Sequence, residues 1–198
     1  MNIDIIIKKL TDIEDELILY KAAHVFVEAY YQDLKMLSDK KEKLIDMFVN
    51  SFNVNYLYAA FIDDKPVGIM AISDKHGRAT KIRKQLLRRV FGFVLASRVF
   101  PLMYKEMCLP MTKDDNVGNI ECVGVLPSMQ GKGVATALIE YAIQNGGFEI
   151  YTLDVYSDNL TAFNIYKKQG FEITKIVPSK NPEIDGYESK MYMQYNHR

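Results

Sequence analysis

The sequence predicts a mixed α/β (α+β) fold, and three parts of the chain carry that prediction. Residues 119–125 form an apolar, β-branched run, a Leu-Pro-Ser turn follows, and residues 130–142 then keep a helical spacing. A further alternating run at 149–156 would pair beside the first strand and complete a β–α–β unit. Upstream, the runs 56–62 and 66–73 flank a charged tight turn, Asp63-Asp64-Lys65, and predict a β-hairpin in which Gly68 marks a bulge.

Length and composition describe an ordinary globular protein. The 198 residues fit a single domain over 1–198, and 48% of them are hydrophobic and 25% charged. The formal net charge is zero, so there is no overall attraction to nucleic acid or to an anionic membrane. Two cysteines are too few for a disulfide scaffold or a Cys-based zinc site, and we expect no metal. Without a basic leader or an apolar run of membrane-spanning length, we expect a cytoplasmic protein that makes no membrane contact.

The first half of the chain predicts a strand and two helices before the hairpin. Residues 3–8 are β-branched and strand-like, and residues 11–14 (Thr-Asp-Ile-Glu) match a capping box. The helix that this box would open has one face made of Ile13, Leu17, Tyr20, His24, Val27 and Tyr31, which predicts a partly buried structural His24. Ser38 would start a second helix with Leu44, Ile45 and Phe48 inward. The aromatic residues Phe26, Tyr30, Tyr31 and Phe48 are either core residues or the lining of an acceptor pocket.

A basic segment separates the hairpin from the central strand. Residues 75–98 carry eight Lys or Arg and hardly any acid, while Ile82, Leu86, Val90, Phe93 and Val94 keep a helical face. Such a helix is either a surface helix whose arginines balance acidic patches elsewhere, or a contact for nucleic acid, anionic lipid or an acidic partner. Phe91 and Leu95 lie on a second face, which a lid contact or a second subunit would cover. Residues 99–111, with two prolines, predict an irregular connector, so the variable basic helical insert spans about 78–112.

The C-terminal third predicts one more helix and a strand pair. Residues 157–159 (Ser-Asp-Asn) offer caps for a helix over Leu160–Lys168, which would stop at Gln169-Gly170. Residues 171–177 are again strand-like, residues 178–186 form a polar loop, and residues 188–195 alternate as a final strand.

Two glycines at the start of the central helix indicate a phosphate site. Gln130-Gly131-Lys132-Gly133-Val134-Ala135 would form its first turn, where each glycine costs about 1 kcal/mol of helix propensity. Bare backbone allows a phosphate or pyrophosphate to approach the unpaired N–H groups of a helix N-terminus. The glycine spacing fits neither a Walker loop nor a dinucleotide fingerprint. The alternative is a Gly-rich turn that only lets the helix pack closely on the sheet.

These residues resemble the acyl-CoA motif of the GNAT superfamily of N-acetyltransferases, in which Gln130, Gly133 and Ala135 occupy the defined positions and Val125-Leu126-Pro127 stands at the preceding turn. A second block, Asn159, Ala162, Tyr166, Gly170 and Phe171, resembles the second conserved block of that family at the expected distance. The resemblance covers about residues 117–177, and the basic helix lies outside the minimal family pattern. It is compatible with a homodimer.

The resemblance implies a GNAT-like mixed central sheet that splays open after the central strand, flanked by helices, with acetyl-CoA in the cleft. Backbone groups of Val123 and Val125 would bind the pantetheine arm, as would Asn159. The pyrophosphate would contact the amides of Gln130, Gly131, Lys132, Gly133, Val134 and Ala135, with the Thr136 hydroxyl added.

The implied reaction is direct transfer of an acetyl group to a primary amine of a small molecule or peptide. Tyr166 carries over from the second block as the acid that protonates the leaving thiolate, with a tyrosine merely packed on the sheet as the alternative. Glu121 is the candidate base, because alternation along a strand would place its side chain on the same face as those of Val123 and Val125. The alternative is that Glu121 is only a salt-bridged strand residue. Cys122 has no activating neighbour in sequence and is not expected to carry an acyl group. A competing interpretation is a non-catalytic CoA-binding or basic-helix interaction module.

Overall fold

Seven strands form a single sheet, and this sheet organises the whole chain. The structure of the protein, a computed structural model, describes residues 3–197, apart from the side chains of residues 184 and 185. The strands are β1 (Ile6–Lys9), β2 (Leu57–Ile62), β3 (Lys65–Ser73), β4 (Val117–Val125), β5 (Ile150–Tyr156), β6 (Glu172–Pro178) and β7 (Ser189–Asn196). Their order is β1-β2-β3-β4-β5-β7-β6, and only β4 and β5 run parallel. The predicted mixed sheet is confirmed.

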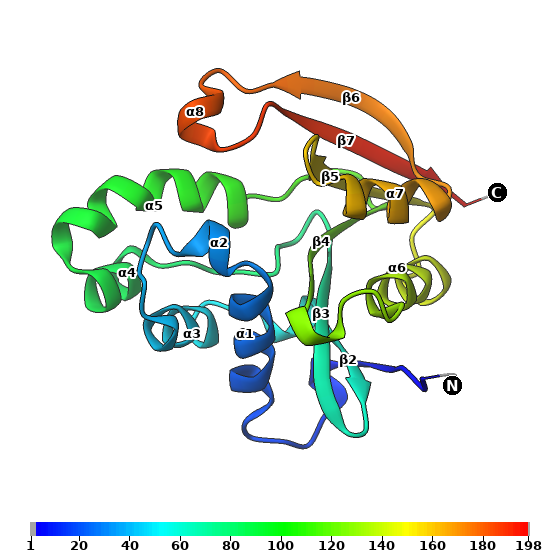
Figure 1. The fold of residues 1–198 in the computed structure, drawn as a ribbon, viewed down its shortest axis with the longest axis horizontal. Coiled ribbons are helices and arrows are strands. Elements are labelled where there is room, and N and C mark those ends of the chain that lie inside the picture. Colours follow the sequence, from blue (N-terminus) through cyan, green and yellow to red (C-terminus); the bar gives the residue numbers. More distant parts are fainter. Residues whose placement is uncertain (1–2, 198) are drawn as a thin grey trace.

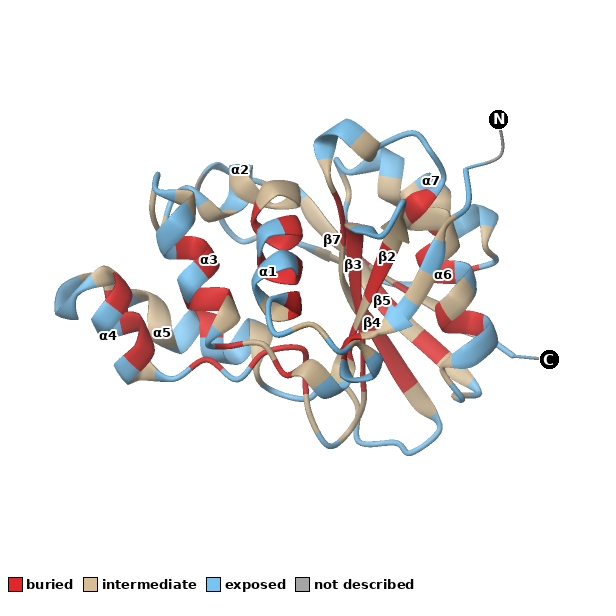
Figure 2. Cartoon of the chain, turned by 90° about the horizontal axis from the view of Figure 1, so that it is seen from below, coloured by how far each residue is buried: buried red, intermediate tan, exposed pale blue. Residues whose placement is uncertain are grey.

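Helices cover both faces of the sheet and enclose two hydrophobic cores (Figures 1 and 2). One face carries α1 (Ile18–Ala29), α2 (Tyr31–Leu34), α3 (Lys41–Val49), α4 (Lys84–Phe91) and α5 (Phe93–Met107). The other carries α6 (Val134–Asn145) and α7 (Leu160–Lys168), and α8 (Pro182–Asp185) lies between β6 and β7. Within β3 the side chains alternate between the cores, since Ile69 and Ala71 join the first and Met70 and Ile72 the second.

The centre of the sheet opens between β4 and β5. The two strands pair only where Val117–Asn119 meet Ile150–Thr152, although β4 continues to Val125 and β5 to Tyr156. Beyond this point β5 stays paired with β7, and β4 stays paired with β3. Figure 1 shows the separation, with β4 and β3 on one side and β5, β7 and β6 on the other. The backbone groups of β4 that face away from β3 therefore have no strand partner.

The predicted hairpin and its bulge are confirmed. Asp63 and Asp64 both have positive φ, 48° and 59°, as the two central residues of a type I′ turn require. The register slips between Ala60 and Phe61, opposite Gly68 and Pro66. A Cβ on Gly68 would lie 2.7 Å from a methyl carbon of Val134, so the missing side chain allows α6 to pack closely on this strand.

The predicted start of the first helix is wrong. Residues 10–12 form a 3-10 turn, the Thr11 hydroxyl bonds the Asp12 carboxylate instead of an amide at a helix start, and α1 begins only at Ile18. The buried face consists of Ile18, Ala22, Ala23, Val25, Phe26 and Val27, and Leu17 and Tyr20 are exposed. His24 is exposed as well and faces Glu28 at 3.9 Å. Ile13 and Leu17 of the predicted face precede the helix, and the inward face of α1 is rotated away from the predicted one.

The basic segment forms two helices instead of one. Gly92 adopts φ 82° and breaks the predicted helix, so that Ile82, Leu86 and Val90 are buried as expected, while Phe93 and Val94 are exposed. The predicted irregular connector is also wrong, because α5 continues through Pro101 to Met107. The proline ring lies at an exposed position in the middle of this helix.

Most of the remaining elements follow the predictions, although part of the polar loop predicted at 178–186 forms the short helix α8. The second helix begins at Lys41, near the predicted Ser38, and buries Leu44, Ile45 and Phe48. Helix α7, strand β6 and strand β7 lie close to the expected ranges, and Gly170, with φ 92°, ends α7. Within residues 3–197, no helix is both long and apolar enough to cross a bilayer.

Candidate active site

The glycines lie in a loop before the central helix, which corrects the predicted helix start at Gln130. Helix α6 begins at Val134, and Gly131 and Gly133 have φ values of 74° and 84°, in the left-handed region that favours glycine. A Cβ added to either one would meet no atom within 4 Å. The alternative that these glycines merely allow close helix packing is therefore excluded, since that role belongs to Gly68.

Six consecutive amides in this loop and the first helical turn are free. Among the described residues, no backbone N–H from Gly131 to Thr136 donates a hydrogen bond, whereas the Ala137 N–H bonds the Gly133 carbonyl at 2.9 Å. Gly133 is the N-cap and no side chain caps the helix. Free amides at a helix N-terminus, together with the helix dipole, create a site for an anion. Lys132 is exposed beside them and adds a positive charge.

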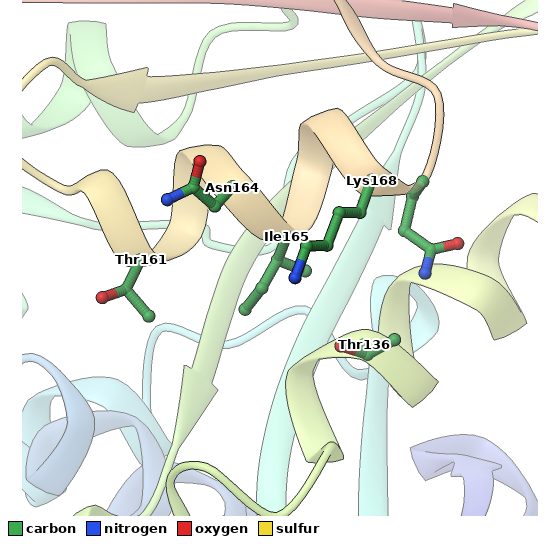
Figure 3. A pocket seen from close by; sticks show the side chains of 6 residues that line it. Thr136, Thr161, Asn164, Ile165 and Lys168 are labelled. Atoms are coloured by element: carbon green, nitrogen blue, oxygen red, sulfur yellow. The ribbon is translucent and has the colours of Figure 1, made fainter.

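A pocket of about 360 Å³ opens between the first turn of α6 and one face of α7. Thr136 supplies the α6 side, and Thr161, Asn164, Ile165, Lys168 and Gln169 supply the other (Figure 3). These α7 residues recur at helical spacing, a signal already present in the sequence but not recognised there as a pocket wall. Lys168 of α7 and Thr136 of α6 line the same pocket, and the Lys168 ammonium lies on the side of α7 that faces α6. Side chains of both helices can therefore contact a phosphate-bearing ligand in this pocket.

The open edge of β4 meets Tyr30 at the end of α1. The Tyr30 hydroxyl donates to the Val123 carbonyl at 2.9 Å, and burial raises the pKa of Tyr30 well above its usual range. Phe26 and Phe48 lie in the first core, with ring centroids 4.5 Å apart. Of the aromatic set, then, Phe26 and Phe48 are core residues, and Tyr30 contacts the strand that carries the predicted pantetheine groups.

A bulge at Cys122 places Glu121 on the opposite face of β4 from Val123 and Val125. Cys122 has φ 59°, and the β3–β4 register slips by one residue there. Glu121 pairs with Ala71 of the first core, whereas Val123 and Val125 join the second. The predicted shared parity is wrong, because one extra residue in the strand reverses the faces. Burial raises the pKa of the Cys122 thiol well above its usual range, which suits a thiol that carries no acyl group.

Glu121 is held by a buried arginine. Arg78 donates to its Oε2 from Nε at 2.8 Å and also from Nη2, and the Ala79 N–H donates to Oε1 at 3.0 Å. Arg78 is only 6% exposed and also donates to the Leu109 carbonyl at 2.9 Å. Sequence patterns did not identify Arg78 as the partner, because the two residues are 43 positions apart. The salt-bridged form of Glu121 is thus present, and its role as a base remains a prediction.

Tyr166 lies at the opening of the sheet with a free hydroxyl. Its side chain is 8% exposed and packs beside Phe171, with ring centroids 6.1 Å apart. The Tyr166 hydroxyl makes no hydrogen bond to the described residues. Every fully buried side-chain oxygen or nitrogen among these residues has a partner, so the hydroxyl oxygen is not fully buried and borders open space. Burial, and then the charge of Asp154, raise the pKa of Tyr166 to about 12. The phenol keeps its proton at neutral pH and can donate it.

Asn159 caps helix α7, which limits what else it can bind. Its Oδ1 accepts from the Ala162 N–H at 3.1 Å. Its amide nitrogen makes no hydrogen bond to the described residues and is available to a ligand. Among the side chains that the structure describes, no three of the His, Cys, Asp and Glu type are grouped so as to hold a metal ion.

Comparisons with known proteins agree with this geometry. A sequence profile of the acetyltransferase (GNAT) family matches residues 19–171. No curated protein sequence gives a match. Similar solved structures include the ribosomal-protein-S18-alanine N-acetyltransferase of Escherichia coli, with 15% identity, TM-score 0.58, and 98% of this chain and 94% of that chain covered. They also include yncA of Salmonella typhimurium, solved with its cofactor acetyl-CoA, with 12% identity, TM-score 0.54 and the same coverage. Identities this low show the shared fold.

The Arg78–Glu121 pair predicts a large loss of stability when the arginine is removed. In Arg78→Ala, a buried carboxylate loses its partner, and we expect the free energy of unfolding to fall by about 3–5 kcal/mol in urea denaturation. Arg89→Ala is the matched control, because Arg89 and Asp46 are 3.4 Å apart and both more than half exposed, and its loss should stay below about 1 kcal/mol. Equal losses in the two variants would contradict a special role for the buried pair.

Proposed function

This chain belongs to the acetyltransferase (GNAT) family, and from that premise we propose that it transfers the acetyl group of acetyl-CoA to a primary amine of a small molecule or peptide. The observation that carries this proposal is the run of six unbonded amides from Gly131 to Thr136, beside a pocket and an unpaired strand edge. A pyrophosphate attached to an extended amide-containing arm has the chemistry that this arrangement can bind.

The pyrophosphate would be held by the loop before α6. The amides of Gly131 to Ala135 and the Thr136 hydroxyl would contact it, with Lys132 and Lys168 as nearby cations. The Gln130 N–H donates to the Pro127 carbonyl at 3.4 Å, a long bond that a ligand would have to replace before this amide could join the set.

The pantetheine arm would follow the open edge of β4. The Val123 carbonyl already accepts from Tyr30, so the N–H of Val123 and the backbone of Val125 would be the groups of β4 that bind this arm. The amide nitrogen of Asn159 is the remaining donor for this arm, because its oxygen caps α7.

Tyr166 is our proposed acid for the leaving thiolate. Its hydroxyl has no hydrogen-bond partner among the described residues, and Tyr166 lies near Asp154 of β5 and near Tyr30, which contacts β4, so the thioester would lie beside it. The breaking C–S bond places negative charge on sulfur, and the phenol proton neutralises it. Because burial favours the neutral phenol, the acid is in its working form across the physiological pH range.

Glu121 is our proposed base, and the bulge places it suitably. It faces the α1 and α5 side of β4, whereas α6 and its anion site lie on the other side. An amine arriving from the α1 side would therefore meet the thioester across the strand edge. Both Arg78 bonds go to Oε2, so Oε1, which accepts only from the Ala79 N–H, keeps a lone pair for a proton taken from the ammonium through a water.

Acetyl-CoA should stabilise the folded protein, and the loop glycines should control this effect. At a hundredfold excess over Kd, we expect a stabilisation of about 2.7 kcal/mol and a raised Tm in a thermal shift assay. Gly133→Ala forces an alanine into the left-handed region of backbone conformation. We expect the Kd of acetyl-CoA, measured by titration calorimetry, to rise at least about tenfold in this variant. Gly147→Ala is the matched control, because Gly147 has a similar φ of 78° and open space but lies at the other end of α6. No Tm shift of the wild-type protein at millimolar acetyl-CoA would refute the proposal.

Replacing Tyr166 with phenylalanine should slow turnover without weakening the binding of acetyl-CoA. We expect kcat to fall by about 10²- to 10⁴-fold, because the thiolate then leaves unprotonated, while the Kd of acetyl-CoA stays the same. Tyr151→Phe, at another buried tyrosine, is the control and should keep its kcat. Since a pKa of about 12 keeps the phenol protonated, the wild-type rate should show no alkaline loss from this group below about pH 11. Unchanged turnover in Tyr166→Phe would remove the residue from the mechanism.

Replacing Glu121 with glutamine should slow turnover while the protein stays folded. Glu121→Gln keeps an oxygen for the Ala79 N–H but cannot accept a proton from the ammonium, and we expect kcat/KM to fall by about 10²- to 10⁴-fold while the Kd of acetyl-CoA stays the same. Thermal unfolding of the variant checks that it is folded. A folded variant with the wild-type rate would show that Glu121 has only a structural role.

A further inference from the structure

The α4–α5 hairpin projects from the sheet and ends in an exposed tip. Gly92, with φ 82° and no atom within 4 Å of where a Cβ would stand, makes the turn between the two helices. The inner faces of the helices contribute Leu86, Leu87, Val90, Ala96 and Met103 to the first core. Figures 1 and 2 show the tip at the far end of the molecule from β5, β6 and β7, so it is available to a large partner.

The outer face of α5 is apolar and cationic along its length. We define the outer α5 face as Phe93, Val94, Arg98, Pro101, Leu102 and Lys105, which are all exposed. Val94, Arg98, Pro101 and Lys105 follow one line of the helix, and Phe93 and Leu102 flank this line on opposite sides. Phe93, Val94 and Leu102 are 66%, 65% and 63% exposed. Phe93 and Val94 are adjacent at the tip, where they expose two large apolar side chains together, and Leu102 lies about two turns further along α5.

The charges on this face are positive. From Lys75 to Lys105 the chain has nine Lys or Arg and no Asp or Glu, and of these Lys75, Arg78 and Arg89 form ion pairs with Asp115, Glu121 and Asp46. The first acidic residue of α5 is Glu106, which follows Lys105. Arg88 lies over the Phe93 ring at 4.6 Å, so a guanidinium is fixed at the tip beside an exposed aromatic side chain. Arg98 and Lys105 form no ion pair with the described residues. The outer α5 face is therefore positive as well as apolar.

We propose that the outer α5 face docks on an anionic phospholipid surface, with Phe93 and Val94 entering the headgroup–acyl boundary. This combination of apolar side chains for insertion and cations for anionic headgroups is that of an interfacial amphipathic helix. A second copy of the chain is a poorer occupant, because a two-fold interface would set these cations against themselves. Nucleic acid is poorer too, because its phosphates give no favourable contact to Val94 or Leu102. This proposal departs from the expectation, drawn from the sequence, that the protein makes no membrane contact.

The proposal is independent of the acetyl transfer. The base of the hairpin is joined to the candidate active site by Arg78, which donates both to Glu121 and to the Leu109 carbonyl. The Thr80 hydroxyl donates to the Met107 carbonyl at 2.7 Å at the same end. The tip lies at the other end of α5. Docking through the tip would hold the protein at the surface and leave the opening between β4 and β5 accessible to an acceptor.

A single tryptophan makes the insertion measurable, since the chain contains none. Phe93→Trp should shift its emission to the blue with vesicles of phosphatidylglycerol and phosphatidylcholine in equal parts, and brominated acyl chains should quench it. Vesicles of phosphatidylcholine alone should have much less effect. Met36→Trp, at a side chain that is 79% exposed and not part of the outer α5 face, is the matched control and should show neither shift nor quenching.

Charge reversal tests the electrostatic part by vesicle co-sedimentation. Arg98→Glu with Lys105→Glu should weaken binding to the anionic vesicles at least about tenfold, and Lys40→Glu with Lys43→Glu, also exposed, should not. If anionic vesicles neither shift nor quench the tryptophan emission of the Phe93→Trp variant, the proposal is overturned. A shift that appears only on dimerisation at high protein concentration, or only with duplex DNA or RNA, would overturn it as well.

Discussion

The separation of β4 from β5 is the constraint on which the rest of the structure depends. A strand in the middle of a sheet normally uses its backbone groups on both sides, and β4 does so only as far as Asn119. The bulge at Cys122 keeps β4 on β3 while its direction changes, and β5 keeps its full register with β7. The exposed edge of β4 must then be satisfied by side chains such as Tyr30 or by a ligand, and this need creates the candidate active site.

At the same opening, the residues of the candidate active site are distributed over the two faces of the sheet. Val123 and Val125 face the core under α6, where the free amides and the pocket lie, while Glu121 faces the core under α1. A cofactor bound on one side and an acceptor on the other would then meet at the strand edge and need not compete for space. The inversion of side-chain parity by a single bulged residue, which made the predicted parity of Glu121 wrong, is what gives this arrangement.

Local sequence patterns predicted most of the helices and strands, but they could not predict contacts between residues far apart in the sequence. Alternation and helical spacing located β4, α6, α7 and the hairpin, and the Gly-Lys-Gly sequence indicated the anion site although the helix starts later. The break at Gly92 was missed because the apolar spacing continues through it, and a single glycine only weakly opposes a helix. The partnership of Arg78 and Glu121 was missed because nothing in a linear pattern brings residues 43 positions apart together.

Arg78 explains how a long insertion coexists with a precisely placed strand. Its guanidinium binds Glu121 on β4 and the Leu109 carbonyl just after α5, so one buried side chain fixes both the start and the end of the hairpin to the strand. The Thr80 hydroxyl on Met107 adds a second tie at the same place. These two buried contacts oppose movement at the base of the hairpin, so its conformational freedom is confined to the tip. The tip can therefore carry exposed apolar and cationic side chains for a partner without disturbing the strand that holds the site.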